Sequence, residues 1–227
     1  MSRVTKRILD LAGGILGLAV FGVPLVILAG LIRLRMSSPV LYRVIRPGLN
    51  GEPFVLYKLR TMRDIADAAG RSLPDKERIT PLGRILRKTS LDELPQLLNV
   101  LIGNMSLVGP RPLMTEYLQL YTRQQARRHE VKPGITGLAQ ITGRNTLSWE
   151  QRFALDVWYV DHANLALDLQ ILLQTVVKVL KRDSISPDGD LDVPSFTGSP
   201  STKHAQRGLH GVPSGLPGKS FATDIES

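Results

Sequence analysis

Two adjacent acidic residues, Asp92 and Glu93, stand in a basic stretch that runs from Arg84 to Gln96. Carboxylates beside cations can serve phosphate chemistry, because Mg²⁺ in proteins usually binds one or two carboxylates together with phosphate oxygens. Neighbouring residues of a helix point about 100° apart, so the two acids cannot face each other and should have different roles. One could attack phosphorus while the other orients a metal or moves a proton.

A purely structural role for the same pair stays open. Ser90-x-x-Glu93 matches a capping box, and acidic residues are favoured in a first helical turn by the helix dipole. Pro95 weakens this alternative, because with Ser90 as the cap, residue 95 would have to donate a backbone hydrogen bond that proline cannot make. With Asp92 as the cap, Pro95 would lie in the first turn, where its missing N–H would not remove a helical hydrogen bond.

Four cations of the chain could neutralise a bound phosphate. They are Lys58, Arg60, Arg87 and Arg111. Arginine makes planar, bidentate contacts with phosphate, although each of the four taken singly is more often a solvated surface charge. Arg111 is the more specific candidate, because a proline on each side restricts the backbone that presents it.

A long apolar segment, Leu11–Ile32, precedes these groups and has no charged or hydrogen-bonding side chain. As a helix it would be about 33 Å long, enough to cross a hydrocarbon core of about 30 Å. Basic residues flank both ends and give no clear inside and outside, and Pro24 should kink the helix. We therefore favour a re-entrant helix that returns to the face it entered. A simple span and a buried helix of a soluble protein stay open.

The other elements that must position the acids are predicted from composition and periodicity. Segments 39–47 and 54–60 have the character of short strands around a Pro/Gly turn. Helical spacing of apolar residues predicts four helices, over 91–102, 113–129, 149–163 and 167–182. The last could pack in the core or lie along an anionic membrane surface.

Charge and composition narrow the classes of partner. The chain carries 29 Lys and Arg against 20 Asp and Glu, which suits nucleic acid, acidic lipid headgroups or phosphorylated metabolites. No aromatic stacking stripe or known nucleic-acid-binding module is present. The absence of cysteine excludes disulfides and thiolate chemistry, and the four histidines lack a metal-ligand spacing.

Four motifs occur in order along the chain. They are Tyr57-Lys58-Leu-Arg60-Thr-Met62, Arg84-x-x-Arg87-Lys88-Thr-Ser-Leu-Asp92-Glu93-Leu-Pro-Gln-Leu, Met105-Ser-Leu-Val-Gly-Pro-Arg111-Pro112 and Pro133-Gly-Ile-Thr-Gly137. In these motifs the chain, over about residues 3–183, closely resembles the bacterial sugar transferase family, the monotopic phosphoglycosyl transferases that begin lipid-linked glycan assembly. The resemblance implies transfer of a sugar-1-phosphate from a UDP-sugar to a polyprenyl phosphate such as undecaprenyl phosphate, with release of UMP, in a cycle that uses Mg²⁺.

The resemblance also implies roles for individual residues. Asp92 would be the nucleophile that forms a covalent phosphosugar intermediate and would contact the metal, with Glu93 as its partner in the dyad. Asp168 matches a further acidic active-site position, although it could equally be a first-turn acid of the last helix. The positions associated with substrate phosphates match Lys58, Arg87 and Arg111.

The expected fold class is an α-rich α+β membrane protein. Residues 1–36 would form a re-entrant membrane helix with its flanks, and residues 37–183 a compact catalytic domain with interfacial amphipathic helices and short strands. Residues 184–227, rich in Pro, Gly and Ser, are expected to be a disordered tail. Many members of the family have Ser-Pro at the kink, where this chain has Val23-Pro24.

The resemblance implies an enzyme of the bacterial inner membrane whose catalytic domain faces the cytoplasm and performs the first membrane step of surface glycan biosynthesis. Its expected partners are the UDP-sugar, the polyprenyl phosphate and membrane lipid, without nucleic acid. The sequence distinguishes neither the sugar nor a monomer from an oligomer. The alternative from another class is a non-catalytic membrane adaptor that binds anionic lipid through its basic face.

Overall fold

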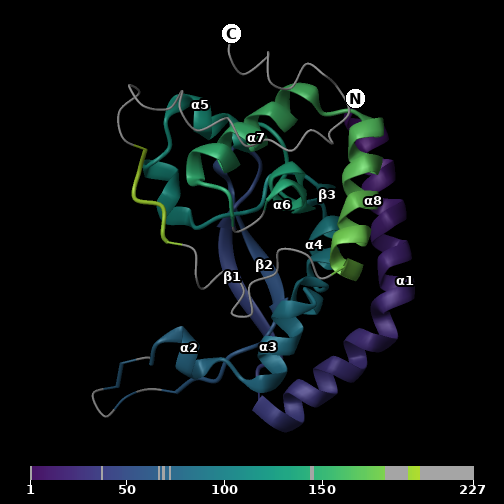
Figure 1. Cartoon of the computed structure of the whole chain (residues 1–227). Coiled ribbons are helices and arrows are strands. Elements are labelled where there is room, and N and C mark those ends of the chain that lie inside the picture. Colours follow the sequence, from purple (N-terminus) through teal and green to yellow (C-terminus); the bar gives the residue numbers. More distant parts are fainter. Residues whose placement is uncertain are drawn as a thin grey trace.

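The computed structural model describes residues 2–36, 38–65, 67, 70–71, 73–143, 146–181 and 194–199. Within these ranges the chain is mostly helical, with two small sheets and one long apolar helix at its N-terminus (Figure 1). This agrees with the predicted helix-rich class. Of the predicted tail, only 194–199 lies within the described residues.

Strands β1 (Leu41–Pro47) and β2 (Pro53–Leu59) form an antiparallel hairpin, which confirms the two predicted strands. The three-residue strands β3 (Ser106–Val108) and β4 (Gly134–Thr136) pair in parallel, and this pair was not predicted. The hairpin presents Lys58 next to the turn that carries the two acids, because β2 contacts that turn.

The remaining helices lie after the hairpin. They are α2 (Asp75–Arg78), α3 (Pro81–Lys88), α4 (Gln96–Ile102), α5 (Arg123–Ala126), α6 (Leu138–Thr142), α7 (Trp149–His162) and α8 (Leu165–Lys181). Helices α7 and α8 confirm the predictions for 149–163 and 167–182. The predicted helix 91–102 is α-helical only from Gln96 onward, because a 3₁₀ turn occupies Leu91–Glu93.

The predicted helix 113–129 is wrong. The segment forms 3₁₀ turns at Thr115–Gln119 and Arg127–His129 on either side of the short α5. Thr122 starts α5 with a capping box in which Gln125 returns a hydrogen bond, so the local polar pattern restarts the helix in the middle of the apolar repeat.

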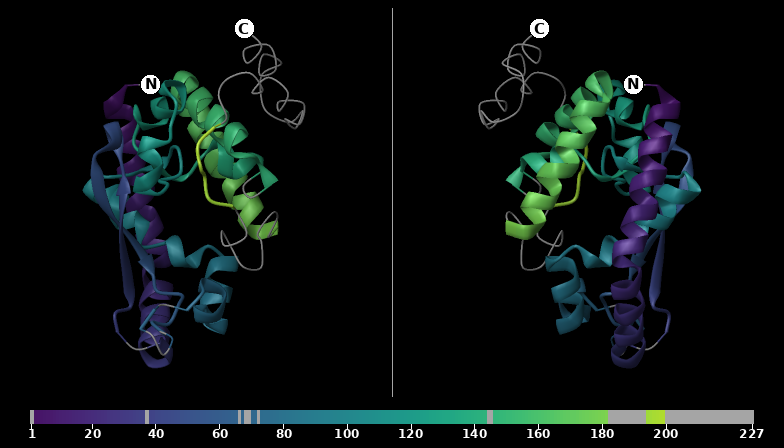
Figure 2. Two further views of the ribbon diagram at one scale, coloured as in Figure 1. Left: turned by 90° about the vertical axis from the view of Figure 1, so that its left-hand side faces the viewer. Right: turned by 90° about the vertical axis from the view of Figure 1, so that its right-hand side faces the viewer.

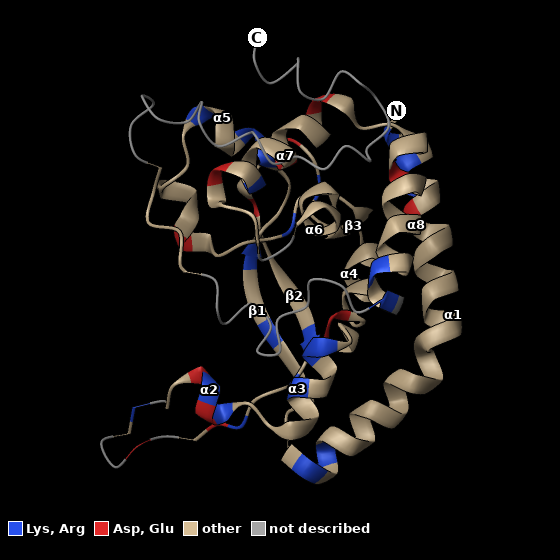
Figure 3. Cartoon of the chain, in the orientation of Figure 1, with Lys and Arg blue, Asp and Glu red and all other residues tan. Residues whose placement is uncertain are grey.

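Helix α1 (Arg3–Met36) contains the whole apolar segment, with Pro24 inside it. Its length and composition would allow it to cross a membrane, with a mean hydropathy of 2.7 in its most apolar window and 6% of that window buried. In Figure 1 it runs along one side of the molecule and turns toward α3 in its second half. Figure 3 shows that its charged residues are confined to the two ends.

Both ends of α1 are fastened to the rest of the chain. Near its start, Lys6 forms a 2.6 Å ion pair with Asp168 of α8, and Arg7 donates two 2.6 Å hydrogen bonds to carbonyls of α4. Near its end, Ile32 and Met36 are buried among leucines of β2 and α3. Both ends of α1 are therefore part of the domain, whereas residues such as Val23 and Val26 between them are 70% and 74% exposed.

The main core lies between α4, β3, α6, α7 and α8. Its most buried members include Val100, Met105, Leu138, Tyr159 and Ile171, and burying a large apolar side chain of this kind contributes roughly 1.5–3 kcal/mol. The opposite face of α8 stays apolar and open, with Leu173 67% exposed. Core packing is thus confirmed for one face of this helix, and the membrane-surface role of the other face stays a prediction.

A second, aromatic cluster joins α7 to the segment 194–199. Tyr117, Phe153 and Phe196 are its buried members, and Tyr121 and Trp149 pack against them. Phe196 is 4% exposed. A part of the chain that was expected to be a disordered tail thus supplies a buried side chain to the domain.

Candidate active site

The two acids lie on a sharp turn between α3 and α4. Ser90 adopts a left-handed conformation with φ of 57°, and its side chain makes no capping hydrogen bond. Pro95 occupies the cap position of α4, where the missing N–H costs nothing. The capping box considered for Ser90 and Glu93 is therefore absent, and the acids are presented by the turn that precedes a helix.

Glu93 binds two of the predicted cations. Its Oε1 accepts from Lys58 Nζ at 2.8 Å and from Arg111 Nη2 at 2.7 Å, and its Oε2 accepts from Arg111 Nη1 at 3.2 Å. Burial alone would raise the pKa of Glu93, but the charges and hydrogen bonds of Arg111 and Lys58 bring that pKa well below its usual range. Glu93 is therefore a permanent anion that holds the two cations in place.

Asp92 differs from Glu93 in the direction of its pKa shift and, within the described ranges, in its lack of a bound cation. Its residue is 7% exposed, and burial, reinforced by the neighbouring Glu93 carboxylate, raises its pKa to about 6 against the opposing charges of Lys58, Arg87 and Arg111. Among the described residues no hydrogen bond or ion pair reaches its carboxylate. A desolvated carboxylate that is ionised at neutral pH and is not engaged by a partner is suited to nucleophilic attack.

The other predicted phosphate ligands divide into two groups. Arg87 donates to Thr61 Oγ1 at 3.0 Å and is close enough to Asp92 to lower its pKa, so it belongs to the site. Arg60 donates to the carbonyls of Ser38 and Met62 and pairs with Asp64. All of its guanidinium nitrogens serve the local fold, and we leave Arg60 out of the proposed phosphate site.

Asp168 is placed in a different network. It is fully buried, pairs with Lys6 at 2.6 Å and accepts from the Tyr159 hydroxyl at 2.7 Å. Among the described residues it makes no hydrogen bond or ion pair with either acid of the dyad. These contacts give Asp168 a structural role. The active-site role that the family resemblance implies for it stays a prediction.

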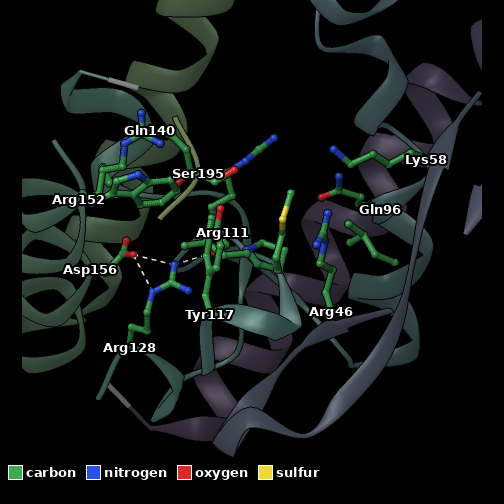
Figure 4. A pocket seen from close by; sticks show the side chains of 16 residues that line it. Arg46, Lys58, Gln96, Arg111, Tyr117, Arg128, Gln140, Arg152, Asp156 and Ser195 are labelled. Atoms are coloured by element: carbon green, nitrogen blue, oxygen red, sulfur yellow. Dashed lines mark hydrogen bonds and ion pairs between the residues drawn. The ribbon is translucent and has the colours of Figure 1, made fainter. Parts of the chain in front are cut away.

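A polar cavity of about 220 Å³ opens beside Lys58 and Arg111. Figure 4 shows Lys58, Gln96 and Arg46 on one side of it and Gln140, Arg152 and Ser195 on the other. Its far wall includes Trp149, whose ring lies 4.8 Å beneath the Arg152 guanidinium. Cations together with an aromatic face are what an anionic ligand with a flat ring requires.

An apolar cavity of about 450 Å³ lies on the other side of Arg111. Phe21 of α1, Leu94 and Leu97 near α4, and Val176 and Val179 of α8 contribute to its walls. Figure 2 shows α1 and α8 close together near the N-terminus and diverging away from it. Glu93 and Arg111 also line this cavity, so the apolar cavity extends to one acid of the dyad and to the arginine that binds it.

A divalent metal could bind here only with help from a ligand. Within the described ranges no group of three or more Asp, Glu, His or Cys side chains could hold one, and the oxygens of Glu93 already accept from Lys58 and Arg111. Mg²⁺ often uses one or two carboxylates with phosphate oxygens and water. Asp92, together with the phosphate oxygens of a bound ligand, would therefore fit Mg²⁺.

Sequence reasoning missed the pair that supports Arg111. Arg128, 2% exposed, binds Asp156 of α7 through two hydrogen bonds of 2.7 and 3.0 Å, and its Nη2 also donates to the Arg111 carbonyl at 2.7 Å. Partners 28 residues apart in the chain carry no local signal. Arg46 and Arg152 of the polar cavity were missed as well, because isolated arginines resemble ordinary surface charges.

Comparisons with known proteins give a consistent result. A family model described as bacterial sugar transferase matches residues 1–182. The chain is 55% identical over 196 residues to an uncharacterized sugar transferase, EpsL, of Bacillus subtilis, which covers 86% of this chain and 97% of that protein. It is 44% identical over 191 residues to the UDP-glucose:undecaprenyl-phosphate glucose-1-phosphate transferase of Caulobacter vibrioides, covering 79% of this chain and 71% of that one.

A third relative is larger than this chain. The undecaprenyl-phosphate galactose phosphotransferase of Salmonella typhimurium is 39% identical over 199 residues, which cover 80% of this chain and 42% of that protein. The matched part therefore corresponds to less than half of that relative.

Proposed function

The chain belongs to the bacterial sugar transferase family, and from this premise we propose that it transfers a sugar-1-phosphate from a UDP-sugar to undecaprenyl phosphate or a similar polyprenyl phosphate. It is an enzyme of the sugar-phosphate transferase class. Relatives are named for glucose-1-phosphate and galactose phosphate transfer to undecaprenyl phosphate, so the sugar differs within the family.

The observation that carries this proposal is the unequal state of the two acids. Glu93 binds Lys58 and Arg111, whereas Asp92 is buried and not engaged. In the first step an Asp92 oxygen attacks the phosphorus that bears the sugar, the bond from that phosphorus to the bridging oxygen breaks, and UMP leaves with that oxygen. The product is an aspartyl phosphosugar. In the second step a phosphate oxygen of the polyprenyl phosphate attacks the same phosphorus and releases Asp92.

Lys58 and Arg111 would stabilise the charge that develops on the transferring phosphoryl group. Preorganised cations in a site with little water are worth far more than in solution, because they need not reorient during the reaction. Glu93 supports this role by holding both cations at 2.8 and 2.7 Å from one of its oxygens. We therefore assign Glu93 to positioning rather than to attack.

The two cavities suggest where each substrate binds. The polar cavity, with its cations and Trp149, suits the nucleotide, and the apolar cavity between α1, α4 and α8 suits an isoprenoid chain. Arg111 lines both. A donor phosphate and an acceptor phosphate could therefore reach the same cation from opposite sides in the two steps.

Mg²⁺ is the cofactor that we propose, held by Asp92 together with the diphosphate of the donor. When bound, it would neutralise charge on that diphosphate. The protein side of the same task is performed by Lys58, Arg87 and Arg111, which surround Asp92 closely enough to lower its pKa against burial.

We propose that α1 enters the membrane and returns to the face it came from. Lys6 at one end and Met36 at the other both contact the domain that contains the dyad. Ends that are tied to one domain are difficult to place on opposite sides of a bilayer. The apolar exposed residues of α1 and α8, such as Val26 and Leu173, would then face lipid, and the domain would lie on the cytoplasmic face of the inner membrane.

Trapping of the intermediate tests this function. The enzyme is incubated with a UDP-sugar labelled at the sugar phosphate, without acceptor, for a panel of UDP-sugars. We expect label to bind covalently to the wild type and to Asp75→Asn, an exposed acid of α2, but not to Asp92→Asn. Covalent label on folded Asp92→Asn would contradict the nucleophile. Absence of acceptor-dependent UMP release with every donor would contradict the reaction and would favour the adaptor.

A further inference from the structure

The segment Pro194–Ser199 lies beyond the residues that the family model matches, yet it is built into the wall of the polar cavity. Ser195 lines the cavity, and Figure 4 shows it on the side of Gln140 and Arg152, away from Lys58. We propose that this segment completes the donor site and that Ser195 contacts the nucleoside end of the UDP-sugar. This inference rests on the proposed function.

The anchor of the segment is Phe196. Its ring packs edge-on against Phe153 at 5.0 Å and against Tyr117 at 5.6 Å, and it stacks on Tyr121 at 5.9 Å. Edge-to-face and offset-stacked aromatic pairs of this kind are stabilising beyond the area that they bury. A side chain that is 4% exposed and surrounded in this way fixes the backbone on one side of Ser195.

Hydrogen bonds fix the backbone on both sides of the same residue. Trp149 Nε1 donates to the Pro194 carbonyl at 2.9 Å, and the Phe196 N–H donates to the Tyr117 hydroxyl at 3.1 Å. Farther along, Gln125 Nε2 donates to Ser199 Oγ at 2.7 Å. Ser195 thus stands between two anchored neighbours.

Two of the anchoring side chains, Trp149 and Tyr117, themselves line the polar cavity. Any ligand that packs on Trp149 would therefore lie beside the chain segment that Trp149 holds. The reacting phosphate belongs near Lys58 and the dyad, so the opposite end of the donor, which is the nucleoside, is the part that reaches Ser195. A hydroxyl there can donate or accept a hydrogen bond.

The test compares two variants that add the same charge two residues apart. Ser195→Glu places a carboxylate in the cavity wall, and Thr197→Glu places one on an exposed residue that does not line the cavity. Equilibrium binding of UMP and UDP is measured by calorimetry on the full chain in detergent. The Michaelis constants for the UDP-sugar and for the polyprenyl phosphate are measured on the same preparations.

We expect Ser195→Glu to weaken UMP binding and to raise the KM for the UDP-sugar by about tenfold or more, because an added carboxylate beside an anionic ligand costs 1.4 kcal/mol or more. The KM for the polyprenyl phosphate should stay within about twofold, and Thr197→Glu should match the wild type in all measurements. A selective effect of this kind would not arise from loss of stability alone.

Equal UMP affinity of Ser195→Glu and the wild type would overturn the inference, as would equal weakening by both variants. Phe196→Ala gives a second measurement, since release of the anchor should raise the KM for the UDP-sugar more than the KM for the acceptor. A wild type that binds neither UMP nor UDP would overturn the donor site itself and thus the proposed function. If the wild type binds UMP but Ser195→Glu does not bind it more weakly than the wild type and Thr197→Glu do, only the role of the segment is overturned.

Discussion

Arg128 Nη2 donates a 2.7 Å hydrogen bond to the main-chain carbonyl of Arg111, so one arginine fixes the backbone of another. Arg128 is itself neutralised by Asp156 in a pair that is almost fully buried. Arg111 in turn binds Glu93. Arg111 is thereby connected to Asp156 of α7, across the polar cavity, through Arg128.

The first prediction concerns this buried pair. Asp156→Ala should lower the free energy of unfolding by about 3–5 kcal/mol, because it leaves the Arg128 charge buried without its partner. The double variant Arg128→Met with Asp156→Ala should be more stable than Asp156→Ala alone. Denaturant titration of the wild type, of each single variant, Asp156→Ala and Arg128→Met, and of the double variant measures this, and additive effects of the two substitutions would contradict the coupling.

The second prediction is that the two acids of the dyad affect stability with opposite signs. The pKa of Asp92 is raised by burial, so its ionisation opposes folding as the pH rises from about 4 to about 6. Asp92→Asn should therefore be more stable than the wild type at pH 7.5, by on the order of 1–3 kcal/mol, and the gain should vanish below pH about 4.

Glu93→Gln should do the reverse. The pKa of Glu93 is depressed by Arg111 and Lys58, so its contribution is present above the unfolded pKa and is lost as the pH falls through the folded one. The free energy of unfolding of Glu93→Gln should be lower than that of the wild type by about 3 kcal/mol at pH 7.5. Thermal unfolding at several pH values measures both variants, and a shift of the same sign in both at pH 7.5 would disprove the assignment.

The third prediction concerns the pH dependence of the covalent step. Attack requires the Asp92 carboxylate to be ionised, and its pKa is about 6. The rate of labelling by a UDP-sugar should rise with pH to a plateau above 7 and fall about tenfold per unit well below 6, with the slope of one proton. Rapid-quench measurements give this profile. A rate independent of pH between 4.5 and 8 would remove Asp92 as the titrating nucleophile.

The fourth prediction separates two arginines that were both candidates for binding phosphate. Arg111→Lys keeps the charge but loses the two-nitrogen contact with Glu93, and kcat should fall about 10- to 100-fold. Arg60→Lys loses contacts to main-chain carbonyls instead. It should lower the melting temperature while the KM for the UDP-sugar stays unchanged, and a donor-specific defect in Arg60→Lys would return Arg60 to the phosphate site.

The fifth prediction concerns topology. The chain has no cysteine, so single cysteines introduced at Ser2 and Ser38 report on the two ends of α1 without background. Both should react with a membrane-impermeant maleimide from the same side of sealed, oriented vesicles. Reaction from opposite sides would show that α1 spans the bilayer.

The hairpin, α7 and α8 could be predicted because the pattern of apolar and polar residues that is typical of each is sustained over its whole length. The parallel pair β3–β4 could not, since three residues are too short to show alternation. The difference between Lys58 and Arg60 was hidden for another reason. Strand β2 ends at Leu59, and the guanidinium of Arg60 just beyond it binds Ser38, Met62 and Asp64, contacts that the motif does not show.

The sequence predicted which residues belong to the candidate site better than it predicted the contacts between them. Asp92, Glu93, Lys58 and Arg111 were all named from the sequence, and the structure brings them together. The sequence did not predict that Glu93 binds the cations while Asp92 does not, and the left-handed conformation of Ser90, which begins the turn that carries both acids, has no signal in a serine.

Helix α1 packs on the domain through small residues. A Cβ on Gly14 would lie 2.8 Å from Leu101 Cδ2, and one on Gly13 would collide with Leu107. Helix α1 and α4, which follows the dyad, are thus in direct contact. A version without α1 should lose the shape of its active site. Under the topology proposed for α1, one helix would then serve both the packing of the active site and the attachment to the membrane.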